Sequence, residues 1–405
     1  MLFARQPIFD RSGQVVGYEL LYRSEESPER AAGAGADTML STVLVDAVLE
    51  IGLDAAADGR QAFLNFSETH LVEGVASLLD PSAVVVEVQE DVAATSQVVV
   101  ACERLRAAGY RLALDNFRLG DPRTPLLEHA SLVKVDTLSH DEASLAALAE
   151  SVRGRATLVA TRVEDAAVRD RCQALGFELF QGYFFRKPEL VQRKDLTPDV
   201  IRTLTLMNLL RDPEVAQAEV VEGFRGDPAL TVKLLRMANS AAVGAREVSS
   251  IPHAIGLLGR GPLYRWVALI FAAAAGRTTG MKGELLREVL IRARFCESAA
   301  ERAGLLDSGE AFLVGLFSRL EPLLGVPLSE LLDQVRLAEP VERALTERAG
   351  FLAWVLELAE AHEAADWERA GNVAESAGLD ELAVSDCYLD ALAWMRTSME
   401  QLAAA

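Results

Sequence analysis

The stretch RLALDNF, residues 111–117, is an apolar run that follows Gly109 and ends in the polar pair Asp115 and Asn116. A parallel strand that is covered on both faces is apolar along its length, so this run predicts a buried strand with the polar pair at its C-terminal end. In barrels and doubly wound sheets, chemistry takes place at that end of the strands. We therefore expect Asp115 and Asn116 to belong to a functional site.

The same pattern recurs along the first half of the chain. Short β-prone runs carry polar residues near their middle or C-terminal end, and these residues are Glu19, Asn65, Glu87, Lys134, Thr161, Glu164 and Gln181. Alanine- and leucine-rich segments of helical length, such as residues 92–108 and 141–152, separate the runs. This alternation predicts a parallel sheet with crossover helices, and about seven units favour a closed barrel. The polar residues are then expected to converge on one mouth of the barrel.

The start of the chain departs from this alternation. Residues 5–23 predict an antiparallel hairpin, with a turn at Asp10 to Gly13 and a second strand that carries Glu19. Residues 24–37 are charged and then rich in alanine and glycine, which predicts a loop beside the barrel mouth. An apolar stripe predicts a helix over about residues 38–51. The expected fold of this half is a TIM-like (β/α) barrel with an antiparallel first strand.

The second half shows helical patterning throughout. β-type patterning ends at Phe185, so a domain boundary is expected in KPELVQRKDLTPDV, residues 187–200. Three helix starts are predicted where an N-cap residue precedes a proline, at Thr197, Asp212 and Asp227. With 405 residues, the chain exceeds the size at which single cores usually stop growing. We expect a barrel domain at residues 1–190 and an all-helical domain at residues 196–405.

The composition excludes several classes of partner. The 60 Asp and Glu residues outnumber the 40 Lys and Arg residues, and the formal charge of -20 argues against nucleic acid and anionic membranes as partners. The longest apolar run, at residues 266–275, is shorter than the roughly 20 residues of a spanning helix. Four dispersed cysteines without ligand spacing predict buried, reduced thiols, at Cys102, Cys172, Cys296 and Cys387. We expect a cytoplasmic protein without a secretory signal or membrane insertion.

The motifs of the first half resemble those of the EAL domain family, whose members hydrolyse or bind cyclic di-GMP. Over about residues 3–190, they are ELLYR, FLNFS, VVEVQE, ALDNF, LVKVD, ATRVE and FQGYFFRKP. The second half resembles the HDOD domain, a helical relative of HD phosphohydrolases, in DPALTVKLLRMANSA, SSIPHAIGLLG, RARFCESAAE and AFLVGLFSRLEPLLG. The pairing is similar to the EAL-HDOD two-domain proteins of bacterial signal transduction.

The resemblance implies roles for individual residues. Four residues match the positions that hold one divalent cation in active EAL enzymes, Glu19, Asn65, Glu87 and Asp115. Their chemistry suits Mg or Mn, which take hard oxygen ligands. The remaining matches are a catalytic lysine, a later glutamate, a motif glutamine and an arginine that reaches a ligand phosphate, at Lys134, Glu164, Gln181 and Arg23.

Three departures from the family pattern fall on the second metal site. Asn116 stands where active members have a second Asp, and Thr161 where they have the first Glu of an E-x-V-E motif. The segment RLGDPRTP, residues 118–125, replaces a glycine-rich loop. Two-metal hydrolysis needs both cations about 3.5 to 4 Å apart, and an amide and a hydroxyl do not supply the lost charge. We therefore expect an inactive barrel with vestigial Lys134 and Glu164.

The helical half shows a comparable loss. The positions that match the metal-binding His-Asp pair of HD enzymes read Ser318 and Arg319, so no hydrolase activity is assigned to this half. No cofactor is expected to be required, and at most a single residual Mg or Mn site is expected in the barrel.

Three functions are compatible with these residues. The preferred one is a catalytically inactive signalling or scaffold protein of a cyclic di-GMP-related bacterial pathway, which acts through protein-protein contacts. The second is a weakly active cyclic di-GMP phosphodiesterase, since the four cation-site residues and Lys134 occur together. The third is a receptor that binds cyclic di-GMP without cleaving it, with Arg23 and Gln181 as candidate ligand-binding residues.

Overall fold

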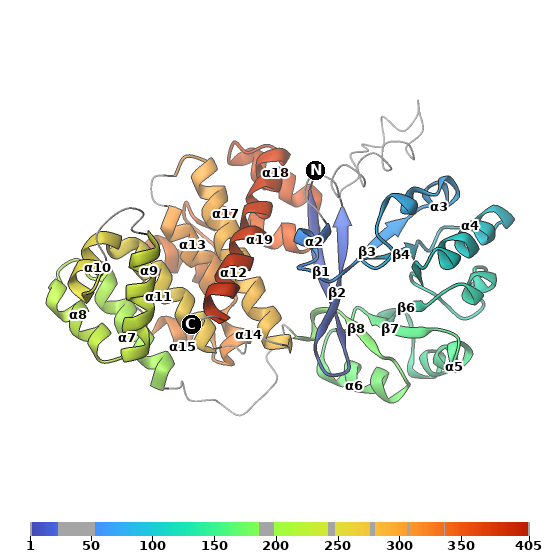
Figure 1. The fold of residues 1–405 in the computed structure, drawn as a ribbon, viewed down its shortest axis with the longest axis horizontal. Helices are drawn as coiled ribbons and strands as arrows, with labels where there is room; N and C mark the ends of the chain where they lie inside the picture. Colours follow the sequence, from blue (N-terminus) through green and yellow to red (C-terminus); the bar gives the residue numbers. More distant parts are fainter. Residues whose placement is uncertain are drawn as a thin grey trace. The chain divides into compact units, whose positions relative to one another are not determined.

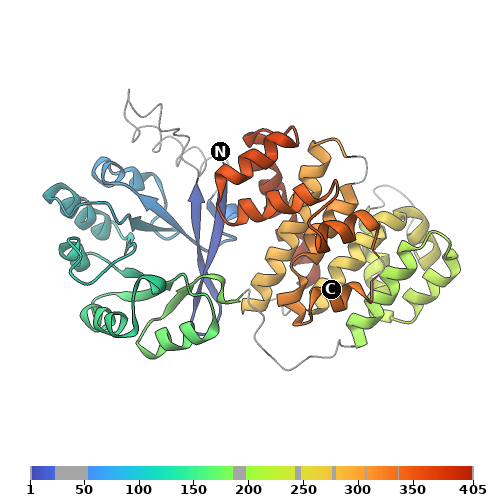
Figure 2. The ribbon, with the colours of Figure 1, turned by 180° about the vertical axis from the view of Figure 1, so that it is seen from behind.

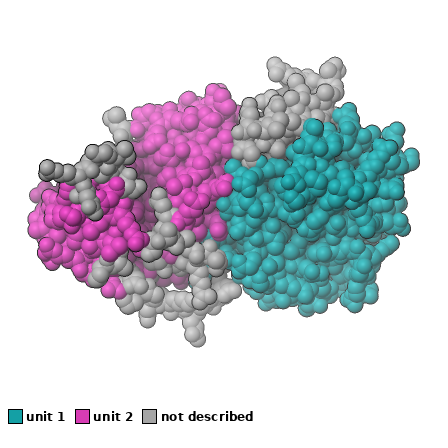
Figure 3. Space-filling view, in the orientation of Figure 1, with its two compact units in different colours: residues 1–187, 279–284, 361–369 teal, residues 188–278, 285–360, 370–405 magenta. Residues whose placement is uncertain are grey.

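The computed structural model describes residues 2–22, 53–185, 198–241, 248–275, 280–305, 308–335 and 337–403. The chain divides into two compact units, which Figure 3 shows in different colours. Unit 1 comprises residues 1–187, 279–284 and 361–369, and unit 2 comprises residues 188–278, 285–360 and 370–405. Unit 1 contains all the described strands, whereas the described part of unit 2 is helical.

Eight strands form a closed barrel in sequence order (Figures 1 and 2). They are β1 Phe3–Asp10, β2 Val15–Tyr22, β3 Gln61–Phe66, β4 Val84–Val88, β5 Arg111–Leu114, β6 Leu132–Asp136, β7 Thr157–Thr161 and β8 Leu179–Gln181. Strand β1 is antiparallel to β2 and β8, and the other neighbours pair in parallel. The predicted TIM-like barrel with an antiparallel first strand is confirmed.

The hairpin of β1 and β2 turns where the sequence predicts. The Asp10 carboxylate accepts hydrogen bonds from the backbone N–H groups of Ser12, at 2.8 Å, and Gln14, at 2.9 Å. Gly13 has a φ of 78°, which glycine adopts without steric cost. The predicted loop at residues 24–37, the predicted helix at 38–51 and Arg23 lie outside the described residues.

Helices cover the outside of the barrel (Figures 1 and 2). They are α2 Leu53–Ala56, α3 Glu68–Glu73, α4 Ser96–Ala107, α5 Glu142–Val152 and α6 Ala166–Ala174. Short 3-10 helices are η2 Val75–Leu78, η3 Thr124–Glu128, η4 Thr137–Ser139 and η5 Tyr183–Phe185. Helix α4 begins after Thr95 and helix α5 after Asp141, and each of these side chains accepts a hydrogen bond from the first helical turn. The helices expected within residues 92–108 and 141–152 are confirmed.

The second half is helical, as predicted. Its helices are α7 Pro198–Arg211, α8 Gln217–Arg225, α9 Pro228–Ala241, α10 Ile251–Leu258, α11 Arg260–Ala275, α12 Gly280–Arg302, α13 Ser308–Phe317, α14 Leu320–Leu324, α15 Leu328–Leu332, α16 Glu339–Thr346, α17 Ala353–Glu363, α18 Trp367–Ser376 and α19 Glu381–Ala403. Among the described residues, every helix is too short or too polar to cross a membrane. All four cysteines are buried and free, which confirms the prediction of buried thiols.

Two of the three helix starts predicted at Xaa-Pro steps are correct. Helices α7 and α9 begin at their prolines, and the Leu230 N–H donates to the Asp227 carboxylate at 3.0 Å. The start predicted at Asp212 is wrong, because helix α8 begins only at Gln217. The Asp212 carboxylate instead accepts a hydrogen bond from the Glu214 N–H at 3.0 Å. An aspartate that bonds its own backbone two residues on forms a turn, which competes with helix initiation.

Candidate functional site at the barrel mouth

The polar residues of the strands lie on one layer of the barrel interior. Below them is a buried apolar cluster, made of Ile8, Phe63, Val85, Ala113, Leu132 and Val159, against which Val16 and Leu179 pack. Side chains alternate along a strand, so the residue two positions further on faces the same interior. From β3 to β8, that next position holds Asn65, Glu87, Asp115, Lys134, Thr161 and Gln181. This register explains why the predicted site residues come together at the carboxyl ends of the parallel strands.

The centre of this polar layer is the ammonium group of Lys134. Its Nζ atom lies 2.7 Å from Oε2 of Glu19, 2.8 Å from Oε1 of Glu87 and 3.6 Å from Oδ1 of Asp115. The side chains of Lys134 and Glu87 are buried, whereas that of Asp115 is 32 % exposed toward the mouth. We call these four residues the floor cluster. The three carboxylates expected to hold one divalent cation thus surround an internal ammonium group.

Two amide side chains complete the surroundings of Glu19. Asn65 Nδ2 donates to Glu19 Oε1 at 3.3 Å, and Gln181 Nε2 donates to Glu19 Oε2 at 2.7 Å. The backbone after Gln181 passes very close to the loop after β7, because a Cβ atom on Gly182 would lie 2.3 Å from the carbonyl oxygen of Val163. Glycine at position 182 therefore allows Gln181 to reach the floor cluster.

Burial and charge act in opposite directions on the pKa values of the floor cluster. Burial raises the pKa of Glu19, but the Lys134 ammonium group and the hydrogen bonds from Gln181 and Asn65 together outweigh burial and hold this pKa below its ordinary value. Burial and the nearby Glu19 charge raise the pKa of Glu87 well above the usual range. Burial lowers the pKa of Lys134, but the surrounding carboxylates raise it overall. Lys134 therefore stays protonated and is not available as a general base.

The donor atoms of the floor cluster suit Mg or Mn, but their arrangement does not. Carboxylate oxygens are the ligands that these cations prefer. Within the described residues, however, no three His, Cys, Asp or Glu side chains are arranged to hold a metal ion. Lys134 Nζ takes the position between the carboxylates. The residual cation site expected at Glu19, Asn65, Glu87 and Asp115 stays a prediction.

A pocket of about 480 Å³ opens at the mouth. Strand ends contribute Asn65, Asp115, Asp136 and Thr161 to its wall, and loops contribute Gln89, Glu90, Asp91, Asn116 and Arg162. Both positions at which the resemblance implies lost acidic residues, Asn116 and Thr161, line this pocket. The departures from the family pattern therefore fall together on one surface.

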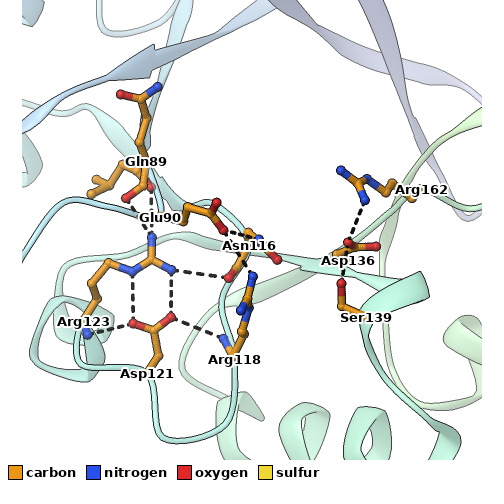
Figure 4. A network of polar contacts seen from close by, with 10 residues as sticks. Gln89, Glu90, Asn116, Arg118, Asp121, Arg123, Asp136, Ser139 and Arg162 are labelled. Carbon is orange, nitrogen blue, oxygen red and sulfur yellow. Dashed lines mark hydrogen bonds and ion pairs between the residues drawn. The ribbon is translucent and has the colours of Figure 1, made fainter.

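Two ion pairs with exposed arginine side chains border the pocket (Figure 4). Arg118 Nη2 lies 3.4 Å from Glu90 Oε2, and the Asn116 side-chain amide donates to the same carboxylate. Arg162 Nη1 lies 3.2 Å from Asp136 Oδ2. We call Glu90–Arg118 and Asp136–Arg162 the rim pairs. The cationic residues of these pairs are Arg118 and Arg162. Both lie in segments that differ from the family pattern, but the sequence did not identify them as site residues.

A buried arginine holds residues 118–125 in place, the segment that stands where the family pattern has a glycine-rich loop (Figure 4). Arg123 makes two hydrogen bonds to the Asp121 carboxylate, at 3.0 and 2.7 Å, and its side chain is 2 % exposed. Its Nη1 atom also donates to the Gln89 carbonyl at 2.9 Å. Arg123 thereby joins the loop after β5 to the end of β4. The sequence signal for this role was weak, since it consists of an Asp and an Arg two residues apart.

One predicted site residue of the barrel, Glu164, does not line the pocket. It is exposed in the loop after β7. In the helical half, Ser318 Oγ accepts a hydrogen bond from Arg292 Nη1 at 3.0 Å and donates to the Gly315 carbonyl at 2.8 Å. The position that matches the His of HD enzymes therefore takes part in helix packing contacts.

Comparison with known proteins identifies both halves of the chain. The family model of the EAL domain matches residues 1–188, and that of the HDOD domain matches residues 196–340. The chain is 32 % identical to the cyclic di-GMP phosphodiesterase CdgJ of Vibrio cholerae, over 96 % of this chain and 91 % of CdgJ. It is 29 % identical to the uncharacterized protein YuxH of Bacillus subtilis, over 98 % of each chain.

Among solved structures, the chain is similar to the phosphodiesterase PaMucR in complex with cyclic di-GMP. The identity is 25 % and the TM-score is 0.36, and the match covers 45 % of this chain and 95 % of PaMucR. The relationship to CdgJ extends over nearly the whole of both chains, and the two domain families follow each other in the predicted order. The chain therefore belongs to the family of EAL-HDOD two-domain proteins and is related to cyclic di-GMP signalling proteins.

Proposed function

We propose that this chain is a catalytically inactive signalling protein that acts in a cyclic di-GMP-related pathway through contacts with other proteins. The observation that carries this proposal is the position of Lys134 Nζ, within 2.8 Å of both Glu19 and Glu87. An internal ammonium group stands among the carboxylates that the resemblance assigns to a divalent cation.

The chemistry of the mouth supports inactivity in two further ways. Hydrolysis of a phosphodiester by two metal ions needs one cation to activate water and another to stabilise the leaving group. Asn116 and Thr161 line the pocket and bring no negative charge for the second cation. Lys134 has a raised pKa and cannot accept a proton from water at neutral pH. The side chains present therefore bind and orient charge but do not assemble a hydrolytic centre.

Incubation of the full chain with cyclic di-GMP in the presence of Mg²⁺ or Mn²⁺ tests this proposal, with products separated by liquid chromatography. We expect the cyclic dinucleotide to persist and no linear dinucleotide to form. The matched control is the Glu87→Gln variant, which removes a floor carboxylate. Turnover in the parent that disappears in this variant would support a weak phosphodiesterase instead.

A second candidate function is the binding of cyclic di-GMP without cleavage, which the pocket at the mouth favours. A volume of about 480 Å³ lies within the range of small-molecule sites. Binding needs a formed pocket and a cation for the ligand phosphates, but not a hydrolytic metal pair. Calorimetric titration of cyclic di-GMP into the full chain tests this function, and saturable heat without product is the expected signature.

A further inference from the structure

We propose that Arg162 replaces the second divalent cation of the mouth, and that its guanidinium group binds a phosphate of a cyclic dinucleotide without a metal ion. This inference rests on the second candidate function, binding without cleavage. It assigns the ligand contact to a residue that follows Thr161, the position at which the family pattern has an acidic residue.

The Arg162 side chain lies where a ligand in the pocket can reach it. Arg162 lines the pocket together with Thr161 and Asn116, where the two acidic residues of the family pattern are missing. Its side chain is 69 % exposed, so an incoming ligand can reach the guanidinium group. A positive charge thus stands on the wall that has lost two negative charges.

The backbone at Arg162 has an unusual conformation for a residue with a long side chain. Arg162 has a φ of 54°, a left-handed backbone conformation that residues other than Gly, Asn and Asp rarely adopt. Thr137 Oγ1 donates to the carbonyl groups of Thr161, at 3.0 Å, and Arg162, at 3.2 Å, which holds the turn in place. Such a conformation is unfavourable for a residue other than glycine and is concentrated at functional sites. Glycine would fit this backbone, yet the chain carries a long cationic residue.

Cationic side chains lie beside most of the carboxylates that line the pocket. Three of its carboxylates already have a cationic neighbour, since Glu90 pairs with Arg118, Asp115 with Lys134 and Asp136 with Arg162. Asp136 also accepts hydrogen bonds from the Leu138 N–H and the Ser139 hydroxyl group. These bonds stabilise Asp136 when the guanidinium group turns toward a ligand. Arginine has five N–H donors in a planar fork that matches a phosphate, so one ion pair does not exhaust it.

The experiment is calorimetric titration of cyclic di-GMP into the full chain, once with EDTA and once with Mg²⁺. The test variant is Arg162→Gly, because glycine keeps the left-handed backbone while it removes the guanidinium group. The control is Arg162→Lys, which keeps the charge but not the planar fork. Thermal unfolding of each variant verifies that the fold is intact.

We expect the parent to bind in EDTA with an affinity that Mg²⁺ does not change. Arg162→Gly is expected to weaken binding about tenfold or more, and Arg162→Lys to fall between the two. Binding that requires Mg²⁺, or binding that Arg162→Gly leaves unchanged, would overturn the role of Arg162 while the receptor function stands. A parent that does not bind at all would overturn the receptor function and this inference together.

Discussion

The floor cluster and the rim pairs place cationic side chains beside carboxylates in two different environments. In the floor cluster, one buried ammonium group lies close to three carboxylates, two of which are buried. In the rim pairs, each carboxylate has its own arginine, and the arginine side chains are 58 % and 69 % exposed. Removal of a buried charge leaves its partners uncompensated, whereas water and salt screen an exposed pair. The floor is therefore expected to govern stability, and the rim is expected to govern ligand binding.

The largest effect is expected from Lys134→Met, which leaves the floor carboxylates without their cation. Breaking a buried ion pair on one side costs about 3–5 kcal/mol of unfolding free energy, and urea denaturation measures this loss. The double variant Lys134→Met/Glu87→Gln is the control, because it removes one of the stranded charges. It should recover part of the loss, and a single variant as stable as the parent would contradict the assigned role of Lys134.

The next largest effect is expected from Arg123→Met, because Asp121 and the Gln89 carbonyl lose a buried partner. We expect a loss of about 3 kcal/mol in the same urea experiment. Arg118→Met is the matched control in the same loop, and its exposed pair with Glu90 should contribute less than about 1 kcal/mol. Equal losses in both variants would remove the distinction between buried and exposed pairs.

A smaller effect is expected at the rim from Asn116→Asp, which places a second carboxylate beside Glu90. Without metal, lost hydrogen bonding and repulsion should lower the unfolding free energy by about 1 kcal/mol. Added Mg²⁺ should reverse this loss, since the new carboxylate is a hard oxygen ligand. Asn116→Gly is the control, because it keeps the left-handed backbone, at a φ of 47°, without the charge. A variant indifferent to Mg²⁺ would show that Asn116 does not mark a lost cation site.

The smallest expected effect is a change in the pH dependence of stability, which has opposite signs for two carboxylates of the floor cluster. The pKa of Glu19 is lowered, so its contribution to stability is present above the unfolded pKa and is lost as pH falls through the folded pKa. The pKa of Glu87 is raised, so its contribution is present below the unfolded pKa and is lost as pH rises through the folded pKa.

Urea denaturation at several pH values between about 4 and 8 tests these signs. At neutral pH, Glu19→Gln should be less stable than the parent, because the Lys134 ion pair is lost. Glu87→Gln should be more stable, because the amide replaces a carboxylate whose ionised form is penalised. Changes of the same sign in both variants would contradict the division of charge within the floor cluster.

The sequence predicted the barrel because the pattern that encodes it is local. From β3 to β8, each strand carries an apolar residue that is followed two positions later by a polar one, as in Phe63 and Asn65 or Leu132 and Lys134. This spacing is readable from single strands, and the closed barrel then brings the polar residues together. The partners within the site were less predictable. The pair between Lys134 and Glu19 joins residues that are 115 positions apart in the sequence. It depends on closure of the barrel rather than on any local motif.

The rim was the least predictable part of the site. Arg162 and Arg123 lie in loops, where neither period nor apolar pattern marks a functional residue. The resemblance drew attention to the missing acids at Asn116 and Thr161, but not to the arginines beside them. The helix start predicted at Asp212 failed for a related reason, because the same residue types serve caps and turns.

Titration of Mn²⁺ into the full chain, followed by the paramagnetic resonance of the free ion, tests most directly whether internal cations have replaced the metal ions of the mouth. We predict that the signal of free Mn²⁺ is the same with the parent as with the Glu87→Gln variant, because Lys134 and the rim arginines already lie beside the carboxylates. Saturable uptake of one ion by the parent that the variant abolishes would contradict it.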